Sequence, residues 1–158
     1  MNLSDLIRPA DVIVALRVRD KAQLLGELAR QAAARCDAAG PAILAALSAR
    51  ERLGSTGLGR GFALPHARVD GVERLLGLFV RLARPIDFEA IDDEPVDVIF
   101  LLLIGPRADD DHVAALAAVA REMRGDGALR DARAAADAPA LYRRFTAGPS
   151  SFPPAASG

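Results

Sequence analysis

The stretch "DVIFLLLIG" (residues 97–105) decides the fold, because it contains a run of seven consecutive apolar residues. This run is far shorter than the roughly 20 residues that a membrane-spanning helix needs. It is instead typical of a central β-strand that is covered on both faces. Helical and strand patterns interleave along the rest of the chain. We therefore predict an α/β fold, a three-layer α/β/α sandwich around a mixed β-sheet.

Two further strands and three main helices are predicted around this central strand. Short β-branched or apolar runs predict strands at 11–18 and 74–83. The spacing of apolar residues predicts helices at 20–36, 40–54 and 109–123. Shorter helices are expected at 127–135 and 138–145. The small, polar and proline-rich segment 147–158 is expected to be a disordered tail, which leaves 1–146 as the domain.

The helical patterns also predict which residues face the core. The first helix begins with a capping-box pattern of Asp20 and Gln23, and its apolar stripe extends to Cys36. The third helix is expected to bury residues spaced i, i+3, i+4 and i+7, namely Val113, Leu116, Ala117 and Ala120.

Composition limits the classes of function. The chain has 158 residues, 51% apolar and 26% charged, which suits one globular domain. A net charge of −1 gives no general attraction to nucleic acid or to an anionic membrane. The amino terminus shows no secretion signal. A cytoplasmic protein is therefore expected, with no nucleic-acid partner and no membrane insertion.

Metal chemistry is disfavoured by the choice of residues. Cys36 is the single cysteine, and the chain has only two histidines, so a zinc site would lack its usual ligands. We expect neither a metal nor a cofactor.

The segment "GSTGLGRGFALPH" (54–66) carries the chemistry. It is not a P-loop, because no Lys-Ser or Lys-Thr follows its last glycine, and it is not a dinucleotide fingerprint, because it follows a helix rather than a strand. A plain connecting loop would explain the glycines but not the exit into "FALPH". Glycine-rich backbone can offer N–H groups to an anion, and Pro65 stiffens the segment that presents His66. This combination suits transfer of a phosphoryl group to an imidazole.

The predicted phosphate-binding loop consists of six residues. Its backbone amides are expected to be the main donors, and the hydroxyl groups of Ser55 and Thr56 either contact phosphate or stabilise the turn. The loop residues are Gly54, Ser55, Thr56, Gly57, Gly59 and Gly61. Arg60 and Arg68 flank the segment and are interpreted as solvated loop arginines.

Residues 50–106 strongly resemble the enzyme IIA domains of the fructose–mannitol class in the bacterial phosphotransferase system, and look most similar to the nitrogen-regulatory branch. The matching motifs are R-E-R before G-S-T-G-x-G-x-G, then A-L-P-H, then P-I-D-F-x-A-x-D-x-x-P-V-D ahead of the apolar strand. A histidine opening the next helix, in "DHVAALAAVARE", completes the set. The resemblance extends over about residues 3–145.

The resemblance implies roles for three residues. His66 would be phosphorylated on Nε2, His112 would orient it or bind the phosphoryl oxygens, and Arg50 would stabilise the phosphate charge. The donor would be a small histidine phosphocarrier protein that is charged from phosphoenolpyruvate through an enzyme I. The output would be regulation of cytoplasmic proteins, such as sensor kinases or transporter subunits, according to phosphorylation state.

Two other functions remain open from the sequence. A sugar-specific enzyme IIA would pass phosphate to a separate IIB/IIC permease, and the absence of an attached IIB, IIC or carrier domain favours the regulator over it. A binding module that is never phosphorylated would not need both His66 and His112.

Overall fold

The structure is a computed structural model that describes residues 1–147 of the chain. These residues form six strands: β1 (Val12–Leu16), β2 (Gly57–Gly59), β3 (Phe62–Ala63), β4 (His66–Arg68), β5 (Leu75–Ile86) and β6 (Val96–Ile104). They also form five α-helices: α1 (Lys21–Ala33), α2 (Gly40–Arg52), α3 (Asp111–Arg124), α4 (Ala128–Ala134) and α5 (Ala138–Thr146). Two 3₁₀ turns precede β1: η1 (Leu3–Asp5) and η2 (Pro9–Asp11). The predicted tail lies outside the described residues, apart from Ala147.

The sheet is mixed, as the sequence predicts. Its strand order is β1-β5-β6-β3-β2, and β4 also pairs with β6. β5 and β6 run antiparallel, whereas β1 is parallel to β5 and both β3 and β4 are parallel to β6. β3 and β4 follow one another along the same edge of β6, with Phe62 beside Val98 and His66 beside Leu102. This edge therefore carries the A-L-P-H segment.

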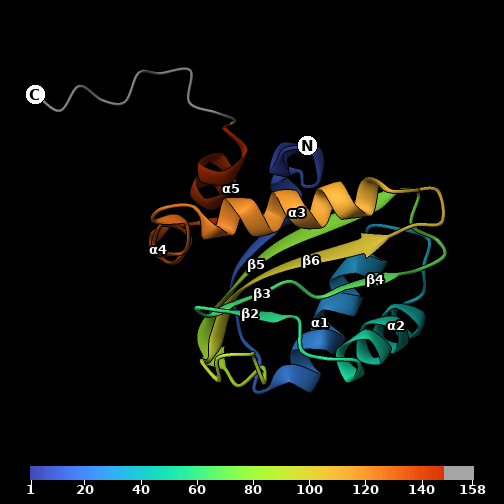
Figure 1. Cartoon of the computed structure of the whole chain (residues 1–158), viewed down its shortest axis with the longest axis horizontal. Helices are drawn as coiled ribbons and strands as arrows, with labels where there is room; N and C mark the ends of the chain where they lie inside the picture. Colours follow the sequence, from blue (N-terminus) through green and yellow to red (C-terminus); the bar gives the residue numbers. More distant parts are fainter. Residues whose placement is uncertain (148–158) are drawn as a thin grey trace, which may run out of the picture.

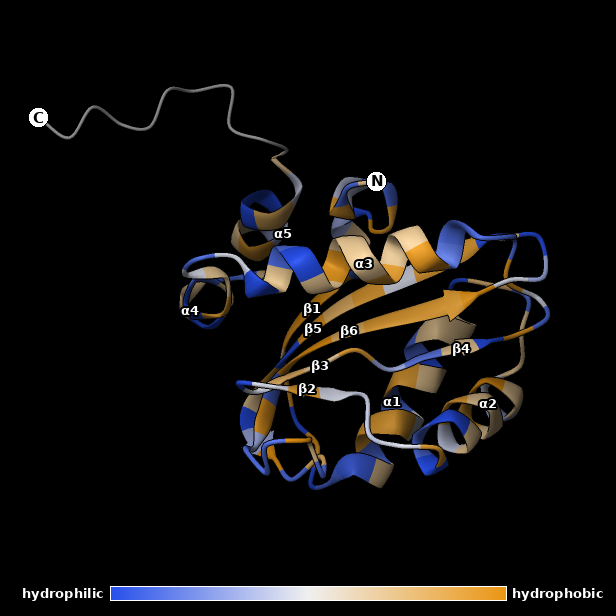
Figure 2. Ribbon diagram, in the orientation of Figure 1, coloured by the Kyte–Doolittle hydropathy of each residue, from blue (hydrophilic) through white to orange (hydrophobic). Residues whose placement is uncertain are grey.

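Helices cover both faces of this sheet, which confirms the three-layer architecture (Figure 1). One apolar core joins α1 and α2 to one face, with Leu28 packed near Leu101. The second core joins η1, α3, α4 and α5 to the opposite face, with Val119 near Phe100. Figure 2 shows β6 as hydrophobic along nearly its whole length between these layers. Every residue of β6 except Asp97 is buried, as expected for a strand covered on both sides.

The first helix begins as predicted and ends three residues earlier. The carboxylate of Asp20 accepts a hydrogen bond from the Gln23 amide at 2.8 Å, as an N-cap does. After Ala33 the chain tightens into a turn, and the Arg35 side chain is held by ion pairing with Asp11. Cys36 lies just beyond the helix and packs, half-buried, against the core of α1 and α2.

The third helix shows that the predicted buried face of 109–123 is wrong. The buried residues of α3 are Ala115, Ala118, Val119 and Met123. Of the predicted set, Leu116 and Ala120 are half-buried, Ala117 is exposed, and Val113 is 58% exposed. Alanines occur on both the buried and the exposed faces of this helix, so the spacing of small apolar residues did not distinguish the two faces. Ala115, Val119 and Met123 belong to the core that also contains Phe79 of β5 and Phe100 of β6.

No helix within residues 1–147 combines the length and apolar character needed to cross a membrane.

Candidate functional site

His66 is the first residue of β4, and the most buried strand of the sheet fixes its position. The carbonyl of Pro65 accepts a hydrogen bond from the Leu102 amide at 3.0 Å. Alternate residues of an extended segment share one face. Leu64 belongs to the core under α3, so His66 also faces the α3 side of the sheet. The ring of His66 is half-buried at the edge of the sheet.

One hydrogen bond defines the tautomer of His66. Its Nδ1 lies 2.8 Å from the carbonyl oxygen of Leu64. A carbonyl oxygen can only accept, so Nδ1 carries the proton and donates it. In the neutral ring, Nε2 then keeps its lone pair. The structure thus leaves the outer nitrogen of His66 ready to act as a nucleophile.

His112 and Arg68 meet on the same side of the sheet as His66. His112 is the second residue of α3, and its Nδ1 lies 2.9 Å from the Asp109 carbonyl oxygen. The Nη2 of Arg68 lies 3.2 Å from Nδ1 and 3.4 Å from Nε2 of the same ring. Arg68 is exposed, as expected of a solvated arginine, but its placement in a loop is wrong, because it lies in β4 against His112. The sequence did hold a signal for this position, because Arg68 is two residues after His66 and alternate residues of a strand share one face.

The glycines do not form the continuous loop around His66 that the sequence suggests. Gly57–Gly59 is strand β2, which pairs antiparallel with β3. Gly59, Arg60 and Gly61 all have positive φ, and together they form the turn of this hairpin. The turn lies beside the beginning of β6, whereas His66 lies beside its end. The structure therefore separates Gly59 and Gly61 from His66, and their role is to return the chain along β6.

Gly57 has a packing reason of its own. A Cβ at this position would lie 2.7 Å from the Cβ of Ala90 and 2.9 Å from its Cα. Only glycine allows that approach without a shift of the backbone. Gly57 therefore belongs to the contact between the hairpin and the segment before β6.

Ser55 and Thr56 are held by the protein itself. The Ser55 hydroxyl donates to the Phe88 carbonyl at 3.4 Å and accepts from the Gly57 amide at 3.0 Å. The hydroxyl of Thr56 donates to the carboxylate of Glu51, and the Thr56 amide lies 3.3 Å from both oxygens of that group. Of the two roles left open for these hydroxyls, stabilisation of the turn agrees with these contacts.

A buried ion pair supports the same turn, and sequence reasoning did not single it out. The Nζ of Lys21 lies 2.8 Å from Glu51, whose side chain is only 7% exposed. Lys21 also lies over the ring of Phe88, 4.4 Å from its centroid. Since the Thr56 carbonyl accepts from the Leu64 amide at 2.9 Å, this network reaches the segment that carries His66. The sequence signal that could have pointed to this ion pair is that Lys21 is the single lysine in a chain with nineteen arginines.

Arg50 lies in the last turn of α2, and its Nη1 donates to the Gly54 carbonyl at 2.9 Å. This bond fixes Gly54 at the start of the loop and uses one of the five N–H groups of the guanidinium.

Arg60 is exposed at the hairpin turn. Its amide donates to Asp92 at 2.9 Å and its carbonyl accepts from Arg133.

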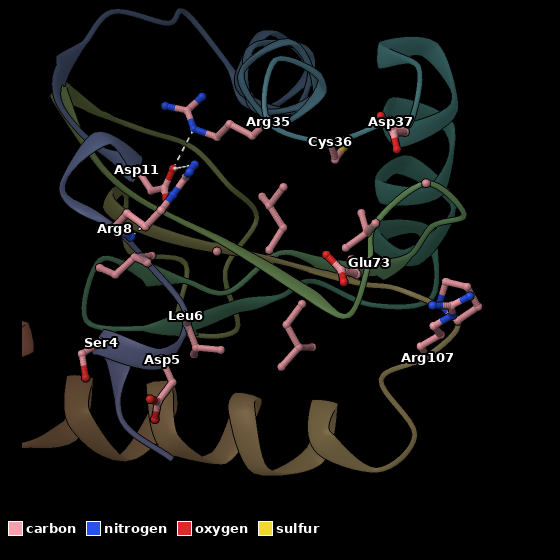
Figure 3. A pocket seen from close by; sticks show the side chains of 17 residues that line it. Ser4, Asp5, Leu6, Arg8, Asp11, Arg35, Cys36, Asp37, Glu73 and Arg107 are labelled. Atoms are coloured by element: carbon pink, nitrogen blue, oxygen red, sulfur yellow. Dashed lines mark hydrogen bonds and ion pairs between the residues drawn. The ribbon is translucent and has the colours of Figure 1, made fainter.

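A separate cavity of about 880 Å³ lies at the end of the sheet between the amino-terminal segment, the end of α1 and the start of β5. Figure 3 shows Arg8, Asp11 and Arg35 on one side of it and Arg107 on another. Asp11 accepts from Arg35 at 2.9 Å and from the Arg8 amide at 2.8 Å. Burial acts to raise the pKa of Asp11, but the hydrogen bonds from the two arginines outweigh it and hold the pKa below its usual value. Neither histidine lines this cavity.

Residues 5–147 match the family described as "Phosphoenolpyruvate-dependent sugar phosphotransferase system, EIIA 2". A nitrogen regulatory protein of Bradyrhizobium diazoefficiens is 44% identical over 142 residues, which cover 90% of this chain and 93% of that protein. The fructose-specific EIIA component of Haloferax volcanii is 39% identical over 82 residues, covering 52% of this chain and 53% of that protein.

The fold agrees with a solved structure of the same kind. The crystal structure of nitrogen regulatory protein IIA-Ntr from Neisseria meningitidis has a TM-score of 0.86 and 28% identity, covering 91% of this chain and 99% of that one.

The chain belongs to the enzyme IIA family of the phosphoenolpyruvate-dependent sugar phosphotransferase system. Within this family it is a homologue of the nitrogen regulatory IIA proteins and a phosphotransfer component.

Proposed function

We propose that the chain is a histidine phosphocarrier that accepts a phosphoryl group on Nε2 of His66 and regulates partner proteins by its phosphorylation state. The observation that carries the proposal is the hydrogen bond from Nδ1 of His66 to the Leu64 carbonyl. It leaves a lone pair on Nε2 of a ring that is fixed by the strand pairing of β4. Phosphoryl transfer depends mainly on such positioning and on stabilisation of charge.

The transfer step needs no cofactor. The lone pair of His66 Nε2 forms a bond to phosphorus while the nitrogen–phosphorus bond of the donor's phosphohistidine breaks. The electron pair of that bond returns to the donor's ring, and the proton of His66 stays on Nδ1, which donates it to the Leu64 carbonyl. His112 and Arg50 would stabilise the charge of the phosphoryl group, with a small histidine phosphocarrier protein as donor.

Intact mass measurement tests this assignment. Purified protein is incubated with phosphoenolpyruvate, an enzyme I and the phosphocarrier protein, and we expect a gain of one phosphoryl group that is labile in acid and stable in alkali. His66→Ala should gain nothing, whereas Arg107→Ala, which removes a charge from the separate cavity, should gain the group normally. Phosphorylation of His66→Ala would refute the assignment.

The regulatory output follows from the charge of the phosphoryl group, about −1.5 to −2 at neutral pH. The chain itself carries a net charge of only −1, so the local field around His66 changes strongly. A partner docking there with acidic groups would be repelled, and like charges in an interface can cost several kcal/mol. We expect at least one partner, such as a sensor kinase or a transporter subunit, to distinguish the two forms by about tenfold or more, at about 1.4 kcal/mol per decade.

Pull-down with phosphorylated and unphosphorylated protein, followed by titration of each captured protein, measures this discrimination. Equal binding of every captured partner to both forms would contradict the regulatory role.

The second candidate, a sugar-specific enzyme IIA, is favoured by the likeness to the fructose-specific component. It predicts transfer of the phosphoryl group from His66 to a IIB protein, which the same mass assay detects.

A further inference from the structure

Arg68 has a place in the site that neither its sequence neighbourhood nor the proposed transfer step explains. Arg68 and His66 are two residues apart in β4, so their side chains leave the strand on the same face. The register confirms this face, because Arg68 pairs with Ile104 and His66 with Leu102, which both belong to the core under α3. The guanidinium of Arg68 ends at the ring of His112.

The contacts of His112 give its two nitrogens different roles. Nδ1 faces the Asp109 carbonyl at 2.9 Å and must donate to it. The Nη2 of Arg68 lies against this ring, 3.2 Å from Nδ1 and 3.4 Å from Nε2, and in the neutral ring only Nε2 can accept from it. The ring is thus held from two sides, by the loop before α3 and by β4. Without Arg68, the hydrogen bond to the Asp109 carbonyl is the polar contact that would still hold it.

We propose that Arg68 is a positioning residue that holds the imidazole of His112 on the face of β4 that His66 shares. This inference rests on the proposed phosphorylation of His66. Its consequence is that the position of the His112 ring on the side of the sheet that His66 faces depends on an arginine from the strand that carries His66. When His66 carries a phosphoryl group, the positive charge of Arg68 lies on the same face of β4 as the negative charge of that group.

The exposure of Arg68 predicts where its effect is measurable. Hydrogen bonds between exposed side chains contribute little to folding stability. Orientation of a charge-stabilising group affects the transition state much more strongly, by about 10²-fold for a lost donor. Substitution of Arg68 should therefore change the rate of phosphoryl transfer and leave the unfolding transition nearly unchanged.

A double-mutant cycle tests whether Arg68 acts through His112. Transfer from the phosphorylated carrier to His66 is measured in single turnover for the wild type, Arg68→Ala, His112→Ala and the double variant. We expect Arg68→Ala to slow transfer by about tenfold in the wild-type background and less than about twofold in the His112→Ala background. Arg68→Lys should restore part of the rate. Equal slowing in both backgrounds, or none in either, would overturn the proposal.

A second readout does not depend on phosphorylation. The ¹⁵N resonances of the His112 ring are recorded for the unphosphorylated wild type, Arg68→Ala and Arg107→Ala. Arg107 serves as the control because it lies before α3 and lines the separate cavity. We expect the chemical shift of the His112 Nε2 resonance to change in Arg68→Ala and to remain at its wild-type value in Arg107→Ala. An unchanged Nε2 resonance in Arg68→Ala refutes the contact. A wild type that never gains phosphate refutes the proposed function alone.

Discussion

At the scale of single residues, the site depends on hydrogen bonds that leave particular nitrogens free or engaged. The Leu64 carbonyl fixes the proton of His66 on Nδ1, and the Asp109 carbonyl does the same for His112. Both acceptors are backbone oxygens, so they are unaffected by substitution of neighbouring side chains. The identity of the free nitrogen therefore follows from the path of the backbone.

Replacement of His112 by alanine should slow phosphoryl transfer and leave the fold intact. His112 is half-buried in the first turn of α3, at the edge of the molecule where α3 begins. Loss of an assisting or charge-stabilising group costs about 10²-fold in rate. Single-turnover transfer measures the rate, and thermal unfolding of the same sample verifies the fold. A folded variant with wild-type kinetics would remove His112 from the mechanism.

At the scale of elements, the β2–β3 hairpin and helix α3 place the two histidines. The hairpin reverses the chain through three residues with positive φ and lays β3 and then β4 along β6. Helix α3 begins where Asp111 meets Arg74 at 2.5 Å, which fixes its first turn beside the end of β6. The position of His112 therefore depends on packing of the whole helix.

The observed face of α3 predicts opposite outcomes for two valines. Val119 is fully buried, and Val119→Ala should lower the free energy of unfolding by about 2 kcal/mol because it removes packed methyl groups. Val113 is 58% exposed, and Val113→Ala should change it by less than about 0.5 kcal/mol. Urea unfolding compares the two variants. A larger loss for Val113→Ala would restore the face that the periodicity suggested.

At the scale of the whole molecule, ion pairs join segments that are far apart in the sequence. Asp11, just before β1, is paired with Arg35 beyond the end of α1, and Glu51 of α2 is paired with Lys21 of α1. The first pair ties the amino-terminal segment to the helical layer beside the cavity seen in Figure 3. The second connects both helices to the turn before β2.

The lowered pKa of Asp11 predicts how stability depends on pH. A carboxylate whose pKa is lower in the folded state stabilises that state above its unfolded pKa, about 4, and loses this contribution as pH falls through the folded pKa. Asp11→Asn should therefore be less stable than the wild type near neutral pH, and the difference should shrink on acidification.

Urea unfolding from about pH 7 to about pH 3 measures this difference. Asp70→Asn, an exposed aspartate after β4, serves as the control and should follow the wild type throughout. A constant difference between Asp11→Asn and the wild type across the range would contradict the assigned ion pairing.

The sequence by itself determined the main elements and the family. The central strand, the α/β/α layers, the strands β1 and β5 and the helices were predicted because local apolar patterns encode them, whereas the short strands β2, β3 and β4 were not. The resemblance carried by the A-L-P-H motif identified the family, which the comparisons confirm, and singled out His66, whose phosphorylation remains a prediction. These inferences need only residues that are close in the chain.

Only the tertiary structure decided which face of α3 is buried, what the glycines do and which residues meet at His112. Alanines lie on both the buried and the exposed faces of α3, so the spacing of apolar residues did not identify the face that packs against the sheet. Gly57, Gly59 and Gly61 belong to a hairpin because the chain returns along β6. Arg68 contacts His112, which is 44 residues away in the sequence, because the register of β4 against β6 places Arg68 beside Ile104 at the end of β6. Such contacts depend on strand register and helix packing, which no local pattern specifies.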